Sequence, residues 1–238
     1  MIGRIDIRDD AGFSLMEVLM TIVVGMIVLA AALEMLTNGF TSSAKVQDRH
    51  DAAGRARQTL DRATALLQAQ QCNGTVSPIV QATPTSVTFT ANMGDVSAYA
   101  SQYALIYQPG GSGEAGQFIE RKWAMGAADG TGYRTPGAYT DRLLVDRVVP
   151  PASGKVFTYY GTDNTIDYTP LVSLTDGAGT ISDAAKLKRV LNVRVALRVL
   201  PTRTKTLDDK TSSLIEVSPF VTSNIDQTKL DQGPQCST

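Results

Sequence analysis

The sequence predicts an α+β protein in which one long N-terminal helix packs on a mainly antiparallel β head domain. Two patterns predict this class. The stretch Val18–Leu33 contains no charged residue, and the polar stretch after it keeps a helical spacing of apolar residues. Near the other end of the chain, Leu191–Val199 alternates apolar and polar residues with the period of two that is typical of a strand.

The first part of the helix has the length and composition of a membrane span. Val18–Leu33 covers only sixteen residues, slightly less than a span needs. Phe13–Met16 before it and Met35-Leu36 after Glu34 extend the apolar segment to an adequate length.

The second part of the helix is amphipathic and extends to about Gln71. We expect a continuous helix from Phe13 to Gln71, about 59 residues long and roughly 90 Å at 1.5 Å per residue. Asn38-Gly39 is its weakest point, and we expect a bend there because glycine destabilises a helix by about 1 kcal/mol. A narrow apolar seam that packs on the head is formed by Ala53, Ala56, Leu60, Ala63 and Leu67.

The chain after Cys72 has strand patterns separated by turn residues. We expect a hairpin-like connection through Pro150-Pro151, a short helix capped by Ser182, and pairing of Leu191–Val199 with Ser213–Thr222. Leu191–Val199 is expected to have one buried and one basic face. Glycine-rich loops are expected at Gly110–Gly116 and Asp129–Gly137. The other expected strands are Ser86–Thr90, Tyr103–Gln108, Gln117–Met125, Arg142–Val149 and Lys155–Tyr160.

The sequence contains little that points to catalysis or to a bound cofactor. The one histidine, His50, falls on the polar side of the helix, so no Ser-His-Asp set and no zinc cluster can be built elsewhere. Asp129-Gly130-Thr131-Gly132 and Asp176-Gly177-Ala178-Gly179 lack the full calcium-loop or phosphate-loop pattern and are interpreted as turns. Asn73-Gly74-Thr75 is interpreted as an incidental glycosylation sequon, and Trp123 as a core or sheet-surface residue. We therefore expect no enzyme activity, catalytic residue, metal or cofactor.

The strongest signal is Gly12-Phe13-Ser14-Leu15-Met16-Glu17, which directly precedes the uncharged stretch. A carboxylate inside a membrane-type helix costs about 2.5–3.5 kcal/mol on insertion scales, so Glu17 needs a partner or a function. If the chain is cut after Gly12, the new α-amino group of Phe13 lies one helical turn from Glu17. The amine and the carboxylate can then neutralise each other, within one subunit or between neighbours.

This motif resembles the class III signal peptide of type IV pilins and pseudopilins. The resemblance implies that a prepilin peptidase cuts after Gly12 and N-methylates Phe13. It also implies that Glu17 pairs with the N-terminus of an adjacent subunit during filament assembly. The alternative is an ordinary membrane anchor in which Glu17 is incidental.

Two departures from the family pattern are present, and the second of them favours a minor subunit over a fibre-building one. Residues 1–12 hold two basic and three acidic side chains, which is a weak positive-inside signal. No proline precedes Pro78, although major pilins commonly carry one about twenty residues into the mature helix. The order of motifs along most of the chain also resembles J-type minor pseudopilins and W-type minor pilins.

The cysteines Cys72 and Cys236 bracket the head. With the head outside the cytoplasm, as the resemblance implies, a disulfide between them is allowed and would tie the C-terminal tail to the end of the helix. The alternative is two unpaired thiols.

The resulting prediction is a minor pilin or pseudopilin that primes or caps a type IV pilus, competence or type II secretion filament. Its expected partners are the prepilin peptidase, other pilin or pseudopilin subunits, the inner-membrane assembly platform and the membrane, with no small-molecule substrate. Removing the leader changes 22 basic and 23 acidic residues to 20 and 20, a neutral balance that gives no electrostatic basis for nucleic-acid binding. The alternative is a membrane-tethered extracytoplasmic binding module, adhesin-like or DNA-capturing, that does not polymerise.

These functions correspond to five expected segments of the chain. The protein is expected to cross the cytoplasmic membrane once, with its head outside, and then to enter a cell-surface or periplasmic filament. The segments are a leader peptide (1–12), a transmembrane or filament-core segment (13–36), the amphipathic half of the helix (37–71), the β-rich head (72–225) and a C-terminal tail (226–238).

Overall fold

The computed structural model describes residues 14–94, 100–111, 114–161, 172–176, 178–202, 214–219 and 236. The chain divides into two compact units between Gln47 and Asp48. The first unit contains the N-terminal part of helix α1. The second contains the rest of that helix and an antiparallel sheet, and the predicted α+β class is therefore confirmed. The expected leader lies outside the described residues, as does the expected tail apart from Cys236.

Helix α1 runs from Leu15 to Gln68 and contributes to both units. It continues through Asn38 and Gly39, which are both helical. It ends three residues before the expected Gln71, because the backbone there pairs with a strand instead. The Gln71 amide donates to the Thr90 carbonyl over 2.9 Å, and the Asn92 amide donates to the Ala69 carbonyl over 2.9 Å.

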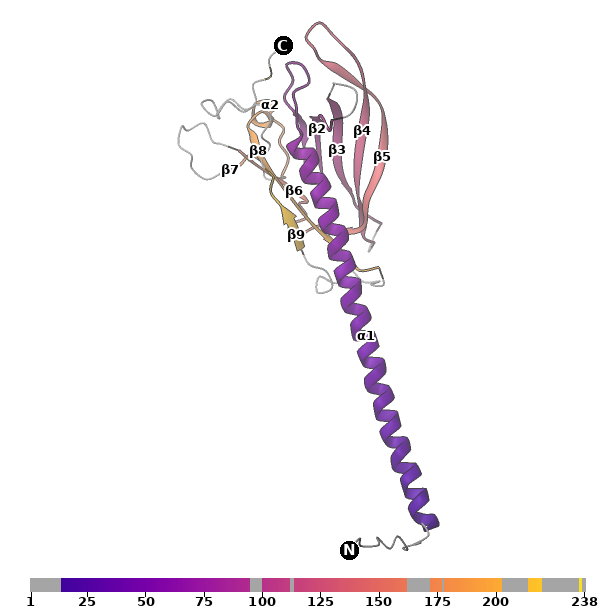
Figure 1. Cartoon of the computed structure of the whole chain (residues 1–238). Coiled ribbons are helices and arrows are strands. Elements are labelled where there is room, and N and C mark those ends of the chain that lie inside the picture. Colours follow the sequence, from indigo (N-terminus) through magenta and orange to yellow (C-terminus); the bar gives the residue numbers. More distant parts are fainter. Residues whose placement is uncertain are drawn as a thin grey trace, which may run out of the picture. The chain divides into compact units, whose positions relative to one another are not determined.

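The sheet of the second unit has nine strands, and every pairing is antiparallel. The first five strands form a meander in chain order, β1-β2-β3-β4-β5, and the order continues β8-β6-β7, with β9 on the other side of β8. Figure 1 shows β2 to β5 side by side, with β4 and β5 the longest. The elements are β1 Ile79–Ala82, β2 Ser86–Ala91, β3 Ser101–Gln108, β4 Gly116–Ala128, β5 Arg134–Val149, β6 Phe157–Gly161, β7 Val172–Ser173, α2 Ala184–Leu187, β8 Val190–Val199 and β9 Leu214–Val217.

The expected hairpin through Pro150-Pro151 is wrong. Strands β5 and β6 do not pair with each other. Both pair antiparallel with β8 on the side opposite β9, β5 at Val199 and Arg198 and β6 from Val195 to Val190. The chain therefore continues in the same direction after Pro150-Pro151, and local sequence contains no information on the distant strand that both segments join. The expected pairing of Leu191–Val199 with the strand after it is confirmed by β8 and β9.

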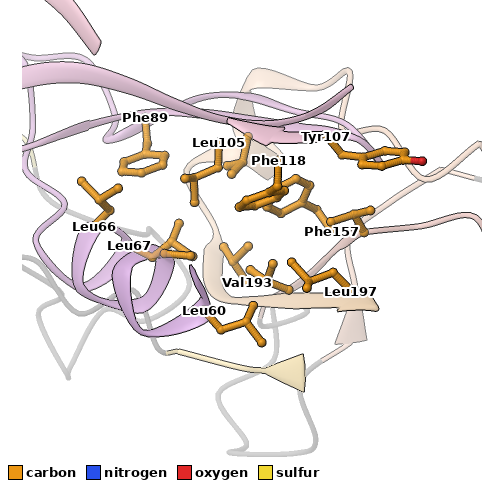
Figure 2. Packing of buried hydrophobic residues seen from close by; sticks show 14 of the residues in the cluster. Leu60, Leu66, Leu67, Phe89, Leu105, Tyr107, Phe118, Phe157, Val193 and Leu197 are labelled. Carbon is orange, nitrogen blue, oxygen red and sulfur yellow. The ribbon is translucent and has the colours of Figure 1, made fainter. Parts of the chain in front are cut away.

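The core lies between the head part of α1 and the inner face of the sheet. Figure 2 shows Leu60, Leu66 and Leu67 of the helix facing Phe89 and Phe118 of the sheet. The helical face that packs there is wider than the predicted seam, because Ala52, Thr59 and Leu66 are buried as well. Ala53 is only half-buried, so the prediction was one position off at its N-terminal end. The buried helical residues are Ala52, Ala56, Thr59, Leu60, Ala63, Leu66 and Leu67.

The basic face of β8, which carries Arg194 and Arg198, is only partly exposed, and Asn192 and Ala196 on it are buried. Residues of β9 and just after it bond side chains of this face. The Asn192 amide donates to the Ser218 carbonyl over 2.8 Å, and the Arg194 guanidinium pairs with the Glu216 carboxylate.

Two smaller expectations also need correction. The cap of α2 is Asp183 and not Ser182, since the Asp183 carboxylate accepts from the Ala185 amide. The glycine-rich loops are shorter than expected, because Gly116 already begins β4 and residues from Arg134 onward belong to β5.

Candidate functional site

The N-terminal part of α1 exposes all of its large apolar side chains. From Leu15 to Leu36 each of them is at least 44% exposed. Among the residues that the structure describes, one helix, α1, is long and apolar enough to cross a membrane. In the second unit the same helix buries its apolar face. The exposed segment therefore needs lipid or neighbouring helices to cover it, because so large an apolar surface is unfavourable in water.

Polar hydroxyls in the apolar segment are satisfied within the helix. The Thr21 hydroxyl donates to the Glu17 carbonyl over 2.7 Å, and the Thr37 hydroxyl donates to the Glu34 carbonyl over 2.9 Å. Such bonds to the preceding turn remove most of the cost of placing a hydroxyl in a membrane. The carboxylates are therefore the groups of this segment whose placement in a membrane costs the most free energy.

Glu17 lies in the first turn of α1. The helix begins at Leu15, and the Glu17 and Val18 amides donate to the Ser14 carbonyl over 2.9 and 3.2 Å. A carboxylate in the first turn interacts favourably with the helix dipole and with the unpaired amides there. Glu17 is exposed, so a group from outside the helix has access to it.

Gly12 and Phe13, the predicted processing residues, lie outside the described residues. Ser14 immediately follows them and directly precedes the helix. An amine created at Phe13 would be four residues from Glu17 in sequence. Pairing of that amine with Glu17, in the same or a neighbouring subunit, stays a prediction.

Glu17 and Glu34 are the two charged residues of α1 before Lys45. They are seventeen residues apart in sequence, which is about 25 Å along a helix. Lipid of ordinary thickness has a hydrocarbon core of about 30 Å. Because this spacing is shorter than the core, the two carboxylates cannot lie outside the core on opposite sides, so at least one of them lies inside the apolar layer of a span that contains both.

The junction after α1 joins the C-terminal tail and the β4–β5 hairpin in the head. Cys72 and Cys236 form a disulfide, with their Cα atoms 5.6 Å apart. Next to it, the Asn73 side chain bonds both backbone groups of Arg134, donating to its carbonyl over 2.9 Å and accepting from its amide over 2.8 Å. The predicted disulfide is thus present, and a buried asparagine extends the connection to the start of β5.

A close backbone approach fixes the same junction. Gly74 has φ +60°, and a Cβ atom there would lie 2.6 Å from the Tyr133 amide nitrogen. Only glycine fits this position, because it tolerates positive φ and has no side chain. The Asn73-Gly74-Thr75 sequon is therefore a structural turn, and its Asn73 amide is buried and bonded instead of free for glycosylation.

The acidic loops are turns whose carboxylates bind their own backbone. The Asp129 carboxylate accepts from the Thr131 hydroxyl and from the Thr131 and Tyr133 amides, and these bonds lower its pKa. The Asp176 carboxylate accepts from the Thr180 amide over 2.8 Å. In the described part of the chain no group of three or more His, Cys, Asp or Glu side chains is arranged to hold a metal ion. His50 is exposed on α1.

Sequence reasoning missed an ordered cluster on the outer face of β4 and β5. The Arg121 guanidinium forms two bonds to the Asp141 carboxylate, of 2.7 and 2.8 Å, and lies 3.9 Å from the ring centroid of Tyr139. The rings of Tyr139 and Trp123 are 6.0 Å apart. The alternation of Arg121 and Trp123 along one face of a predicted strand was the available signal, but their cross-strand partners depend on the β4–β5 register.

Comparison with known proteins adds one match. A family model described as the prokaryotic N-terminal methylation motif matches residues 7–33, which include Gly12, Phe13 and Glu17. No curated protein and no solved structure gives a match. The match covers the segment around the start of α1, whereas the head is characterised by its structure alone.

The chain thus carries a prokaryotic N-terminal methylation motif of the prepilin type, followed by an exposed apolar helix and a pilin-like α+β head. The motif implies processing by a prepilin peptidase and assembly into a pilus-type structure. Motif and helix together indicate a membrane-anchored protein with an extracytoplasmic head.

Proposed function

We propose that this protein is a minor pilin or pseudopilin that primes or caps a type IV pilus-like or type II secretion filament. The observation that carries the proposal is the methylation motif at residues 7–33, placed immediately before a helix that exposes its apolar side chains. Motif and helix are both needed for a subunit that is first held in the membrane and then transferred to a filament.

Cleavage and assembly follow from the chemistry of the N-terminal segment. Prepilin peptidase removes residues 1–12 and methylates the new amine of Phe13. The apolar helix then exchanges lipid for the helices of neighbouring subunits. Glu17 exchanges a costly lipid environment for an ion pair with an N-terminal amine, which favours the filament over the membrane.

A minor role is supported by the sequence of the helix and by the form of the head. No proline lies in the described apolar segment, in contrast to the proline common in major pilins. In the described residues the head has a nine-stranded sheet, and the order of motifs along the sequence resembles J-type and W-type minor subunits.

The processing step gives the direct test. Gly12→Val should leave a full-length precursor in the membrane, since the peptidase needs a residue without a side chain before the cut. Mass analysis of the wild-type N-terminus should find methylated Phe13. An unmodified Met1 in cells that make filaments would refute the proposal, whereas Gly3→Val, in the same leader, should be processed normally.

A tethered binding module is the second candidate, and the Arg121–Trp123–Tyr139 cluster is the observation that favours it. Tyr139 is exposed and the other two side chains are partly exposed, and aromatic and arginine side chains are common in binding surfaces. The two candidates differ in what they require of Glu17. A tethered module tolerates a neutral residue there, whereas a filament subunit does not.

A further inference from the structure

The sequence contains two Asn-Gly pairs, Asn38-Gly39 and Asn73-Gly74, and the structure gives them different surroundings. Asn38 and Gly39 are exposed on α1. Asn73 is 6% exposed, and both polar atoms of its side chain bond the backbone of Arg134. In an Asn-Gly pair the asparagine side chain reacts readily with its own backbone, because glycine has no side chain to hinder the attack. The bonds of Asn73 therefore bear on the chemical stability of the junction after α1.

The reaction is a ring closure followed by hydrolysis. The Gly74 backbone nitrogen attacks the Asn73 side-chain carbon Cγ and loses its proton, while the Cγ–Nδ2 bond breaks and Nδ2 leaves as ammonia. Water then opens the resulting succinimide at either of its carbonyl groups, which gives aspartate or isoaspartate. The net change is one water consumed and one ammonia released, without an oxidant or a cofactor.

Contacts with the β4–β5 hairpin oppose this ring closure in the folded head. The Asn73 Nδ2 donates to the Arg134 carbonyl over 2.9 Å and Oδ1 accepts from the Arg134 amide over 2.8 Å, so the side-chain amide is held away from its own backbone. Gly74 lies against the hairpin loop, where an added Cβ would be 2.6 Å from the Tyr133 nitrogen and 2.7 Å from the Thr131 oxygen. Ring closure thus requires a local separation of this turn from the hairpin.

The disulfide holds the residue directly before the reactive pair. Cys72 precedes Asn73, and its Cα atom is 5.6 Å from that of Cys236. The Asn73 amide donates to the Val76 carbonyl over 3.2 Å, and the Val76 amide donates to the Asn73 carbonyl over 3.1 Å, so a tight turn follows the bridge. Both cysteines are partly exposed, and a dithiol in solution can therefore reach the bond.

We propose that Asn73-Gly74 is a latent site of self-modification, which the disulfide and the Arg134 bonds keep closed. A dithiol reduces the Cys72–Cys236 bond to two thiols and is itself oxidised to a disulfide. The turn then separates from the hairpin more often, and Asn73 is converted to aspartate or isoaspartate. This inference concerns the head alone and holds whether or not the chain assembles into a filament.

The product cannot restore the original junction. Aspartate at position 73 has no Nδ2 donor, so a carboxylate oxygen would face the Arg134 carbonyl. A buried carboxylate that lacks hydrogen-bond donors is unfavourable. Isoaspartate in addition lengthens the backbone by one carbon atom. A loss of the disulfide that is at first reversible thereby becomes a permanent change in the chain.

Peptide mass mapping of the full-length protein in detergent, incubated with and without dithiothreitol, tests the inference. Conversion at Asn73 should be at least about tenfold faster in the reduced protein, because the bonds that hold its side chain are weakened. Conversion at Asn38 is the internal control and should be the same in both samples. Cys72→Ala/Cys236→Ala, incubated without dithiothreitol, should match the reduced wild type.

Local opening has to be distinguished from global unfolding. Trp123 fluorescence should show that the reduced head stays folded, and conversion at Asn73 should not rise with guanidinium concentration below the unfolding transition. A rate that follows global unfolding would overturn the inference, because the whole fold would then protect the site. Equal rates in the oxidised and reduced protein would also overturn it, as would slow conversion in the fully unfolded chain.

Reoxidation separates the reversible step from the permanent one. Protein that is reduced briefly and then reoxidised should regain slow hydrogen exchange in the peptide that contains Arg134, whose amide bonds Asn73. Protein that is reoxidised after conversion should keep fast exchange there, and Asn73→Asp should show fast exchange from the start. Full recovery of slow exchange after conversion would refute the permanent loss of the junction.

Discussion

The two halves of α1 have opposite relations to the rest of the molecule. Between Leu15 and Leu36 every large apolar side chain is exposed, whereas between Ala52 and Leu67 the apolar side chains of one face are buried under the sheet. One continuous helix therefore has one half that is stabilised by its own chain and one half that needs lipid or other chains.

This difference explains why the two halves have different sequence patterns. A segment that is first surrounded by lipid and then by other helices must be apolar on all sides, so it shows no amphipathic period. A segment that packs on one sheet needs only one apolar face, so charged residues occupy its other faces. The predictions below test each half separately, in order of decreasing expected effect.

The largest effect is expected at Glu17, in the half that lacks partners in its own chain. Glu17→Gln would leave the N-terminal amine of a neighbour unpaired among apolar helices, and breaking a buried pair costs about 3–5 kcal/mol. This corresponds to about two to three decades in the assembly equilibrium. The variant should be inserted and cleaved normally but be largely missing from the filament fraction.

The measurement is the ratio of the protein in filaments to that in membranes. Glu34→Gln is the matched control, because it also removes a carboxylate from the apolar segment but lies outside the methylation motif. An unchanged ratio for Glu17→Gln would remove the main argument for assembly and favour the tethered binding module.

The next effect concerns the disulfide just after the half of α1 that packs on the sheet. It joins two cysteines with a sequence separation of 164. Removing a native disulfide typically costs about 2–5 kcal/mol, and the chain-entropy model gives a value near the upper end for so long a loop. The sequence contains only these two cysteines, so a reductant acts on this bond alone.

Guanidinium unfolding of the full-length protein in detergent, with and without reductant, measures this contribution. Hydrogen exchange at the tip of the β4–β5 hairpin should also accelerate, because Asn73 connects the disulfide to Arg134. Cys72→Ala/Cys236→Ala should behave like the reduced protein and be insensitive to reductant. Equal stability with and without reductant would mean that the tail contributes nothing to the head.

Features that depend on local sequence were predicted well. The helix, most of its buried seam, the strand β8 and its partner β9 all follow from periodicity within about ten residues. The processing motif was also found, because its chemistry is contained in six consecutive residues, Gly12 to Glu17.

Features that depend on distant pairings could not be predicted. The pairing of both β5 and β6 with β8 joins segments that are far apart in sequence, and no turn residue indicates it. The Asn73–Arg134 bonds and the Arg62–Glu120 pair join residues 61 and 58 positions apart, so neither has a local signal. The burial of Asn192 on β8 also depends on a distant partner, since its side chain bonds Ser218, 26 positions away.

A leucine-to-alanine substitution made once in each half of α1 compares directly how much each half contributes to the stability of the head. Leu66 is fully buried and Leu29 is 62% exposed. Leu66→Ala should destabilise the head by about 2–5 kcal/mol, because it removes apolar burial and leaves a cavity. Leu29→Ala, the matched control, should leave head unfolding unchanged. Chemical unfolding followed by the fluorescence of Trp123 in the head reports both, and equal effects would show that the two halves are not independent.

The smallest effect compares two arginine–carboxylate pairs of the head that differ mainly in burial. Arg62 bonds Glu120 over 3.0 and 2.8 Å, and Arg121 bonds Asp141 over 2.7 and 2.8 Å. The Glu120 side chain is 6% exposed, whereas that of Asp141 is 38% exposed. Water therefore screens the second pair far more than the first.

We expect Glu120→Gln to lower the free energy of unfolding by about 1.5–3 kcal/mol, the usual value for hydrogen bonds to a charged group. Asp141→Asn should cost at most about 1 kcal/mol, as for other exposed pairs. The Arg121 guanidinium lowers the pKa of Asp141, so this carboxylate stabilises the fold above its unfolded pKa. That small contribution is lost as the pH falls through its folded pKa. Urea unfolding of each variant between pH 7 and pH 3 checks both points. In Asp141→Asn, the free energy of unfolding should fall slightly less between pH 7 and pH 3 than it does in the wild type. A larger loss of stability from Asp141→Asn than from Glu120→Gln would show that burial does not decide the strength of these pairs.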